Sequence, residues 1–328
     1  MRTLIIGDLH LNGNDPLYLQ SQIDFFDEID EFDCHTVIFL GDIFHFRTPK
    51  VLELLAFKDI LHKIVGYGRG DYGMPLRHAI ILAGNHDYFD REYNKSILSL
   101  FSEYDNVSVV TNESNEPDIF SYTEDIVKLK ERLNECKLST IYGHFGYNGL
   151  LSPEGFDENG LTLKDFSKFK RVFLGHIHHH AINDNVCIVG TPYTTSFSEA
   201  GKSSYVALLT EDDYSFDADY VMIPTKTGPR HHILDEANLD TTSLSEDNYN
   251  IVKVISDSME FSKIRKKIPD FVTNITLEPR VAKIGHDSYW TGTTTMLSSY
   301  LENTNTDLDK KKLTKVLKEI QNEQSRND

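Results

Sequence analysis

The 328-residue sequence contains few cysteines and no long apolar run. Its three cysteines (Cys34, Cys136 and Cys187) are odd in number and far apart, which excludes a disulfide framework and a cysteine-ligated zinc cluster. No stretch approaches the roughly 18 consecutive apolar residues that a membrane span requires. The N-terminus has no basic segment followed by an apolar core, so no signal peptide is expected. These absences predict a soluble, cytoplasmic protein with no membrane partner.

Basic residues are also few, because 33 Lys and Arg stand against 51 Asp and Glu and give a net charge of −18. Many of the acidic residues are concentrated in three stretches that contain no Lys or Arg: Asp15–Asp33, Glu103–Asp125 and Glu211–Asp219. Their 19 carboxylates account for the whole imbalance. The near-neutral remainder can carry basic patches, such as the one between Lys263 and Lys267. Charge therefore neither excludes nor supports a nucleic-acid partner.

The first 200 residues alternate short β-branched runs with helical patterns. The apolar runs predict buried strands at Thr3–Ile6, Thr36–Leu40, Ala79–Leu82, Ser139–Tyr142 and Arg171–Leu174. One helix is expected where Ile23, Phe26 and Ile29 recur at helical spacing, and another after an N-cap at Thr48-Pro49, continued by Leu52, Leu55, Ile60 and Ile64. This alternation predicts an α/β fold whose sheet is parallel in its first half.

The second half of the chain follows a different pattern. Strands expected at Val186–Val189, Tyr205–Leu209 and Tyr220–Ile223 have no helices between them and suggest a second sheet packed on the first. After a break near Pro224–Pro229 comes a small βαβ-like unit, with strands at Ile251–Ile255 and Val272–Leu277 around a helix at Phe261–Lys267. Two helices, Met296–Leu301 and Asp307–Glu323, close the chain. We expect three parts, comprising residues 1–228, 229–285 and 286–328.

Metal-ligand residue types follow the predicted α/β strands five times. The five segments are Gly7-Asp8-Leu9-His10, Gly41-Asp42, Gly84-Asn85-His86-Asp87, Gly143-His144 and Gly175-His176-Ile177-His178. Sites in open α/β sheets form at the carboxyl ends of strands, so these loops should converge on one crevice. A glycine precedes the polar residues in each loop, which lets the backbone turn tightly and approach a ligand.

The ligand types in these loops favour a pair of metal ions. Carboxylates, imidazoles and one amide oxygen, with no thiolate, suit Mn²⁺, Fe²⁺ or Zn²⁺. The seven candidates are too many for one four-coordinate ion but are right for two ions that share a carboxylate: Asp8, His10, Asp42, Asn85, His144, His176 and His178. A two-metal site is the usual arrangement for hydrolysing phosphate esters.

Each motif also has an ordinary structural interpretation when it is taken alone. The Asp8–His10 segment and Gly41-Asp42 are each compatible with a turn or a helix cap, and Asn85–Asp87 with a local Asx-turn. His176 and His178 could be a surface histidine pair. The occurrence of all five motifs just after a strand in one chain favours the metal site.

In this order, the five motifs resemble the signature of the calcineurin-like metallophosphoesterase superfamily, over about residues 1 to 210. The resemblance implies a four-layer α/β/β/α fold. It also implies two divalent metal ions, the first bound by Asp8, His10, Asp42 and His178 and the second by Asp42, Asn85, His144 and His176, with Asp42 bridging. His86 would be the non-ligand histidine near the scissile phosphate, acting as a general acid or transition-state stabiliser, and Asp87 would orient it.

The branch of the superfamily is indicated by the segment after Gly41-Asp42. Protein phosphatases of this fold have Asp-Arg-Gly there, whereas this sequence continues Ile43-Phe44-His45, which resembles the SbcD-type DNA nucleases. Gly190–Pro192 and Ser196–Glu199 are similar to the stretch that follows the last histidine motif in that family. At this length, the T-even phage members are the most similar, which would place the protein in the host cytoplasm. Alternatively, His45 caps the following helix.

The C-terminal parts resemble the regions of that family that contact other molecules. The βαβ-like unit resembles a capping domain that helps position DNA. The terminal helices resemble a helix-loop-helix that grips the coiled coil of an SbcC-like, SMC-type ATPase, and a homodimer within a heterotetramer is typical of the family. The apolar stripe Leu313, Val316, Leu317 and Ile320 is then a partner surface, although an intramolecular packing face is the alternative. Trp290 fits an interface or ordinary packing equally well.

The sequence therefore predicts a two-metal DNA nuclease of recombination and repair that uses Mn²⁺ and works with an SbcC-like ATPase. By family resemblance, it would be a 3′→5′ exonuclease and single-strand endonuclease, with His86, Asp87 and His45 as catalytic residues. The nearer alternative is a phosphomonoesterase or small phosphodiesterase of the same superfamily, and the more distant one is a non-enzymatic scaffold. His179 and His180 are expected to be solvated loop residues, and His231 and His232 have no evident partner.

Overall fold

The computed structural model describes residues 1–66, 77–90, 92–112, 114, 116–148, 160–210, 219–257 and 260–280. The expected terminal helices, Trp290 and most of the acidic stretch Glu211–Asp219 lie outside these residues. Within the described residues, no helix combines the length and the apolar character needed to cross a membrane. Residues Met1–Pro279 form one compact unit.

The first sheet has six strands in the order β11-β10-β1-β2-β3-β4. Its parallel part comprises β1 (Arg2–Ile6), β2 (Thr36–Phe39), β3 (His78–Leu82) and β4 (Val107–Val110), with Thr3 opposite Thr36 and Thr36 opposite His78. These strands are the β-branched runs of the sequence, and the parallel arrangement of the first half is confirmed. Strands β10 (Tyr205–Thr210) and β11 (Asp219–Pro224) extend the sheet antiparallel to β1.

The second sheet has five strands in the order β5-β6-β7-β9-β8. They are β5 (Ile119–Phe120), β6 (Thr140–Gly143), β7 (Arg171–Leu174), β8 (Ala181–Asn183) and β9 (Val186–Ile188). The sequence wrongly grouped β10 and β11 with β9 in this sheet. The antiparallel partner of β10 is β1, about 200 residues earlier, and the lack of intervening helices could not reveal that pairing.

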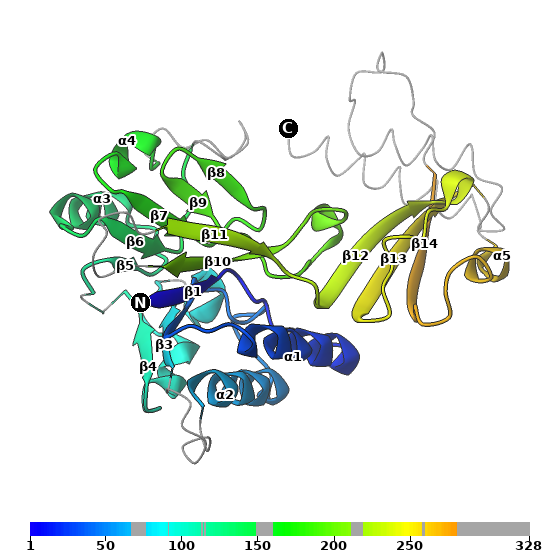
Figure 1. Cartoon of the computed structure of the whole chain (residues 1–328), viewed down its shortest axis with the longest axis horizontal. Coiled ribbons are helices and arrows are strands. Elements are labelled where there is room, and N and C mark those ends of the chain that lie inside the picture. The colour runs from blue at the N-terminus through cyan, green and yellow to red at the C-terminus, as the bar shows by residue number, and fades with distance from the viewer. Residues whose placement is uncertain are drawn as a thin grey trace, which may run out of the picture. The chain divides into compact units, whose positions relative to one another are not determined.

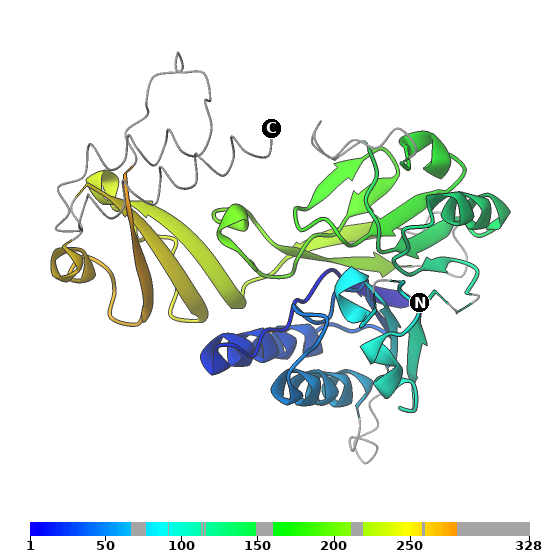
Figure 2. The same cartoon turned by 180° about the vertical axis from the view of Figure 1, so that it is seen from behind.

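Figures 1 and 2 show four layers from opposite sides, and three apolar clusters hold these layers together. The two sheets pack face to face through residues such as Ile38 and Leu40 of the first and Phe173 of the second. Helices α1 (Pro16–Asp30) and α2 (Val51–Val65) cover the outer face of the first sheet, and α3 (Ile126–Glu135) and α4 (Leu163–Phe166) cover that of the second. The α/β/β/α sandwich is therefore confirmed.

Helix α2 begins later than its sequence suggested. The expected N-cap was Thr48, whereas the helix starts at Val51 and its capping residue is Lys50. The buried Glu53 side chain explains this start, because one carboxylate oxygen accepts from the Lys50 amide (2.6 Å) and the other from the Gly13 amide (2.6 Å). Ile60 and Ile64 face the core as expected, but Leu52 and Leu55 are exposed.

A three-stranded parallel sheet follows, in the order β12-β13-β14. Its elements are β12 (Gly228–Asp235), β13 (Asn248–Ser256), α5 (Phe261–Arg265) and β14 (Asn274–Pro279), so the expected βαβ unit is confirmed. Strand β12 was not predicted, because its Gly-Pro start and its run of Arg and His mask the strand pattern. Short 3₁₀ turns complete the fold at Asn85–Asp87, Ile97–Phe101, Phe197–Glu199 and Glu236–Asn238.

Candidate metal centre

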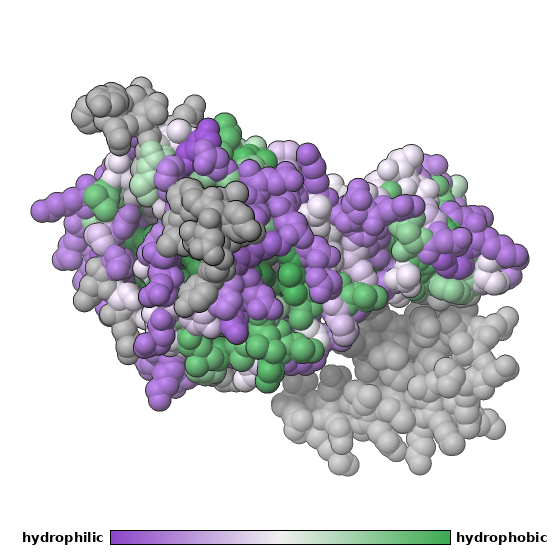
Figure 3. Space-filling view, turned by 60° about the horizontal axis from the view of Figure 1, so that its bottom comes forward, coloured by the Kyte–Doolittle hydropathy of each residue, from purple (hydrophilic) through white to green (hydrophobic). Residues whose placement is uncertain are grey.

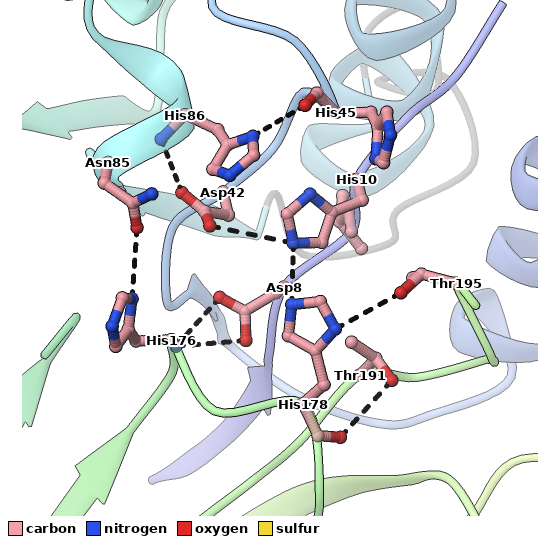
Figure 4. A network of polar contacts seen from close by, with 12 residues as sticks. Asp8, His10, Asp42, His45, Asn85, His86, His176, His178, Thr191 and Thr195 are labelled. Carbon is pink, nitrogen blue, oxygen red and sulfur yellow. Dashed lines mark hydrogen bonds and ion pairs between the residues drawn. The ribbon is translucent and has the colours of Figure 1, made fainter. Parts of the chain in front are cut away.

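The loops after β1, β2, β3, β6 and β7 converge at the carboxyl ends of the strands, as the sequence predicted. Figure 4 shows side chains from the loops after β1, β2, β3 and β7 pointing toward one another. Three of the predicted ligands, Asp8, Asp42 and His144, are buried and offer donor atoms that all lie within 4.8 Å of one another. Direct contacts link the other four predicted ligands to this group: His10, Asn85, His176 and His178.

Backbone conformation at the centre departs from ordinary geometry. His10 (φ 47°), Asp42 (φ 47°) and His176 (φ 76°) all lie in the left-handed region. Such strain is typical of functional sites, because the surrounding fold must enforce it. Gly84 shows how closely the loops approach, since a Cβ there would overlap the Asp42 carboxylate and the His144 ring. The glycines before the polar residues therefore allow the loops to meet.

Asp42 lies between two groups of candidate ligands. Its Oδ2 is 3.6 Å from His10 Nε2, and His10 Nε2 is 3.0 Å from His178 Nε2. On the other side, Asp42 Oδ1 is 3.4 Å from His144 Nε2, which lies 3.3 Å from Asn85 Oδ1. Each carboxylate oxygen thus faces one group, which is the arrangement that a bridging carboxylate needs.

Hydrogen bonds at Nδ1 fix the orientation of two histidine rings. His144 Nδ1 is 2.7 Å from the Leu40 carbonyl oxygen, and His178 Nδ1 is 2.7 Å from Glu199 Oε1. A proton on each Nδ1 satisfies these acceptors and leaves the Nε2 lone pair directed at the centre. Metal-binding histidines commonly donate their second nitrogen to a carbonyl or carboxylate in this way.

The donor set fits a metal ion. The His10 and His178 Nε2 atoms are 3.0 Å apart, and two imidazole lone pairs at this distance require a proton or a cation between them. The spacing also suits neighbouring nitrogens on one ion, with metal–nitrogen bonds of about 2.1 Å. No cysteine takes part, and the mixture of carboxylate, imidazole and amide oxygen suits Mn²⁺, Fe²⁺ or Zn²⁺.

Burial and charge perturb the ionisation of these groups. Burial lowers the pKa of His10 to about 3, which keeps its ring neutral and able to bind a metal. Burial by itself opposes ionisation of Asp42, but the charge of His144 outweighs it and holds the pKa of Asp42 below its usual range. Burial likewise opposes the charge on His144, yet Asp42 and Asp8 raise its pKa to about 9. The two carboxylates therefore create a field that favours positive charge.

His86 lies beside the predicted ligands. Its backbone amide donates to Asp42 Oδ1 (2.8 Å), and its Nδ1 is 2.6 Å from the main-chain oxygen of His45. The His86 ring lies edge-on to His10, with centroids 5.0 Å apart, and the His45 ring is 5.6 Å from His10. The structure thus brings His45 and His86 to the same edge of the centre.

The structure corrects the expected contact of Asp87. Its carboxyl group accepts from the backbone amides of Gly84 (2.9 Å), Ile43 (3.0 Å) and Phe44 (3.3 Å). The Nδ1 of His86 is instead held by His45, so Asp87 positions the loops and not the ring. Motif spacing could not distinguish these roles, because the side-chain direction depends on the 3₁₀ turn at Asn85–Asp87.

Comparison with known proteins agrees with this geometry. The calcineurin-like phosphoesterase family matches residues 1–180, which is more than half of the 328-residue chain. The chain belongs to this family. Over 216 residues it is 28% identical to exonuclease subunit 1 of Enterobacteria phage T4, an alignment that covers 59% of this chain and 60% of that relative. The similarity confirms the resemblance to T-even phage members, and the chain spans about 60% of the relative's length.

Glu199 is a residue of this phosphoesterase whose role the sequence did not reveal. It is 3% exposed, and its carboxylate contacts His178 Nδ1 (2.7 Å), the Thr195 amide (2.6 Å) and the Thr195 hydroxyl (2.8 Å). Although burial alone would raise it, the hydrogen bonds from His178 and Thr195 lower the pKa of Glu199 to about 2. The Ser196–Glu199 motif was the available signal, but a motif does not show which side chain it contacts.

Replacing Glu199 with glutamine is expected to weaken metal binding by about 10–100-fold, the usual effect of removing a carboxylate that supports a metal-binding histidine. The neutral amide still accepts a hydrogen bond but no longer draws the His178 proton to Nδ1. Titration calorimetry with Mn²⁺ on the purified chain would measure the change. An unchanged affinity would show that His178 does not bind metal through Nε2.

Four other histidines have contacts that the sequence did not predict. His231 Nδ1 is 3.0 Å from the Thr194 hydroxyl, and His232 Nε2 is 3.0 Å from Asn250 Oδ1. His179 and His180 are partly buried, and each has a partner in the protein: His179 contacts Lys202, and the Nδ1 of His180 lies 2.7 Å from the Ile188 carbonyl oxygen.

Proposed function

We propose that this phosphoesterase is a two-metal DNA nuclease. Asp8, His10, Asp42 and His178 would bind one ion, and Asp42, Asn85, His144 and His176 the other, with Mn²⁺ as the expected metal. When bound, the ions lower the pKa of a coordinated water and neutralise the oxygens of the reacting phosphate. The opposite orientation of the two Asp42 oxygens supports the sharing of this carboxylate.

The protein groups around the ions position and protonate the substrate. With Nδ1 of His86 held by the His45 carbonyl, its Nε2 remains available to the phosphodiester. In the protonated form, this nitrogen donates to a phosphoryl oxygen or to the leaving oxygen, where negative charge develops. The amide of His86 also donates to Asp42 Oδ1 and thereby ties this ring to the metal-binding carboxylate.

The observation that carries the choice of a nuclease is the position of His45. Its main chain holds His86 and its ring lies 5.6 Å from His10, so a second imidazole faces the substrate where the protein phosphatases of this fold have an arginine. An imidazole is a weaker phosphate ligand than a guanidinium and is less suited to a dianionic monoester. The similarity to a phage exonuclease subunit supports the same choice.

The test is metal-dependent hydrolysis by the purified chain. End-labelled linear and single-stranded DNA would be incubated with Mn²⁺, Mg²⁺ or chelator, beside a phosphomonoester. We expect shortening from 3′ ends and single-strand cleavage with Mn²⁺, none with chelator, and no monoester hydrolysis. Monoester hydrolysis with intact DNA would refute the nuclease and favour a phosphomonoesterase. The absence of any hydrolysis would favour a scaffold.

The acidic stretch Asp15–Asp33 is compatible with a DNA substrate, because at least five of its seven carboxylates have partners within the chain. Asp15 accepts from the Tyr249 hydroxyl, and Glu28 accepts from the Lys226 and Thr227 amides. Three ion pairs involve the other carboxylates: Asp27–Lys63, Asp30–Arg77 and Asp33–Arg2. These carboxylates act mainly as structural partners. We propose that the isolated chain binds DNA weakly and with strong salt dependence, since its 51 acidic residues outnumber its 33 basic ones.

We further propose the expected division into a nuclease domain (1–228), a capping domain (229–285) and a C-terminal segment (286–328) that binds an SbcC-like, SMC-type ATPase.

A homodimer within a heterotetramer is part of this proposal. Figure 3 shows apolar side chains gathered on the face that carries α1 and α2. Val51, Leu52 and Leu55 are 50–69% exposed there. Light scattering that gave twice the chain mass would support the homodimer, and a single mass would refute it.

A further inference from the structure

A pocket of about 290 Å³ adjoins the candidate metal centre. The predicted ligand His178 and its partner Glu199 line it, together with His179, Lys202, Ser203 and Ser204. The His178 side chain is 31% exposed, so the predicted ligand forms part of the wall of a solvent-accessible pocket. This volume suits a small polar group, because drug-sized ligands occupy pockets of about 300–1,000 Å³.

Lys202 is tied to the residue that orients His178. Its backbone amide donates to the Glu199 carbonyl oxygen (3.1 Å), and Gly201 between them adopts φ 73°, which the turn requires. The Glu199 carboxylate holds His178 Nδ1. Lys202 and the predicted metal ligand His178 are therefore both hydrogen-bonded to Glu199.

The charge of Lys202 is not neutralised by a carboxylate within the described residues. Its Nζ donates to His179 Nε2 (2.6 Å), whereas Lys63, Lys253 and Lys263 each pair with an acidic side chain. Glu199 also lines the pocket, but its oxygens are engaged by His178, Thr191 and Thr195. An accessible cation therefore lies next to the centre in a chain that is acidic overall.

Hydroxyl groups complete the lining. Arg230 Nη1 donates to Ser204 Oγ (3.3 Å), so the hydroxyl hydrogen of Ser204 remains free to donate elsewhere. Ser203 is exposed at the pocket. An ammonium group with neighbouring hydroxyl donors is a combination that recognises phosphate oxygens.

We propose that this pocket binds a backbone phosphate of the DNA strand adjacent to the phosphate that is cleaved, with Lys202 as its cationic contact. His179 is a positioning residue, because its Nε2 accepts from Lys202 and limits where the ammonium group can lie. The inference rests on the proposed nuclease function and adds a subsite to it. Such a subsite aligns the strand, so it affects binding of DNA more than binding of a small diester that has no neighbouring phosphate.

The experiment compares Lys202→Gln with Lys137→Gln in the full chain. Lys137 is an exposed lysine that precedes β6, at the end of that strand opposite His144, and is a matched control. Binding of a fluorescent single-stranded oligonucleotide would be followed by anisotropy in chelator over a series of salt concentrations. We expect K202Q to weaken binding about tenfold, the value of one charge-assisted hydrogen bond, and to reduce the salt slope by about one.

Two further measurements define the outcome. First, the Lys202→Arg variant should retain most of the wild-type binding of the oligonucleotide. Second, hydrolysis would be measured with Mn²⁺, and the increase in KM of K202Q over wild type should be about tenfold larger for the oligonucleotide than for bis(p-nitrophenyl) phosphate. Equal binding by K202Q and K137Q, or an unchanged salt slope, would overturn the proposal. Binding is measured in chelator, without cleavage, so the two claims can fail separately. A wild-type chain that cleaves no DNA would refute the nuclease function. A tenfold loss of oligonucleotide binding in K202Q would still assign the pocket to a DNA phosphate.

Discussion

Replacing His86 with glutamine is expected to lower kcat for phosphodiester hydrolysis by about 10²–10⁴-fold, the range for losing a positioned general acid. The His86 ring makes its hydrogen bond to the His45 carbonyl through Nδ1, which leaves Nε2 for the substrate. Glutamine cannot supply an equivalent proton, because its amide does not ionise. The backbone amide of residue 86 can still donate to Asp42 in this variant, so the candidate metal centre should keep its geometry.

Metal content and activity would be measured together on the same H86Q preparation. We expect the same number of bound ions as in the unaltered chain, determined by elemental mass spectrometry, and strongly reduced hydrolysis of both DNA and a small diester. His35→Gln is the control, because His35 is exposed and precedes β2, at the end opposite the centre. A parallel loss of metal would show that His86 is itself a ligand.

Replacing Asp42 with asparagine is expected to reduce metal binding at both positions and to lower hydrolysis by more than about 10³-fold, as the stabilisation from two ions is lost. The substitution removes the charge that faces His10 through Oδ2 and His144 through Oδ1. Folding should survive, because asparagine tolerates the left-handed φ of 47° at this position and its Oδ1 can accept from the His86 amide.

The thermal unfolding temperature provides a readout for D42N that does not depend on activity. If Mn²⁺ binds the folded state, we expect it to raise the Tm of the unaltered chain by mass action, and this rise should be largely absent in D42N. Asp33→Asn serves as the control, because Asp33 is 80% exposed and pairs with Arg2. An equal rise of Tm with Mn²⁺ in D42N and the unaltered chain would contradict the bridging role of Asp42.

Much of the candidate centre could be predicted from sequence because each loop directly follows a buried strand. Runs such as Thr36–Phe39 form strands through local β-propensity and burial, and parallel strands bring their carboxyl ends to one edge. Asp42 and His144 are 102 positions apart but must meet for that reason. The positions of the ligand types were therefore encoded locally.

The supporting contacts could not be predicted because they join distant segments through side-chain direction. Glu199 reaches His178 and Lys202 reaches His179, and both pairings join the loop after β7 to the loop after β9. The assignment of β10 to the first sheet is similar, since its hydrogen bonds go to β1 and not to a neighbour in sequence. Asp87 contacts amides for the same reason.

Sequence alone was sufficient to place residues of metal-ligand type, in the order typical of calcineurin-like phosphoesterases, at the ends of the strands. Local propensity, burial and topology suffice for that result, because they depend on short segments and on the parallel sheet. The tertiary structure was needed to show which atoms face the centre, which groups hold His86 and His178, and that Lys202 lies in a pocket beside them. Those features depend on rotamers and loop packing, which arise from contacts between residues far apart in the chain.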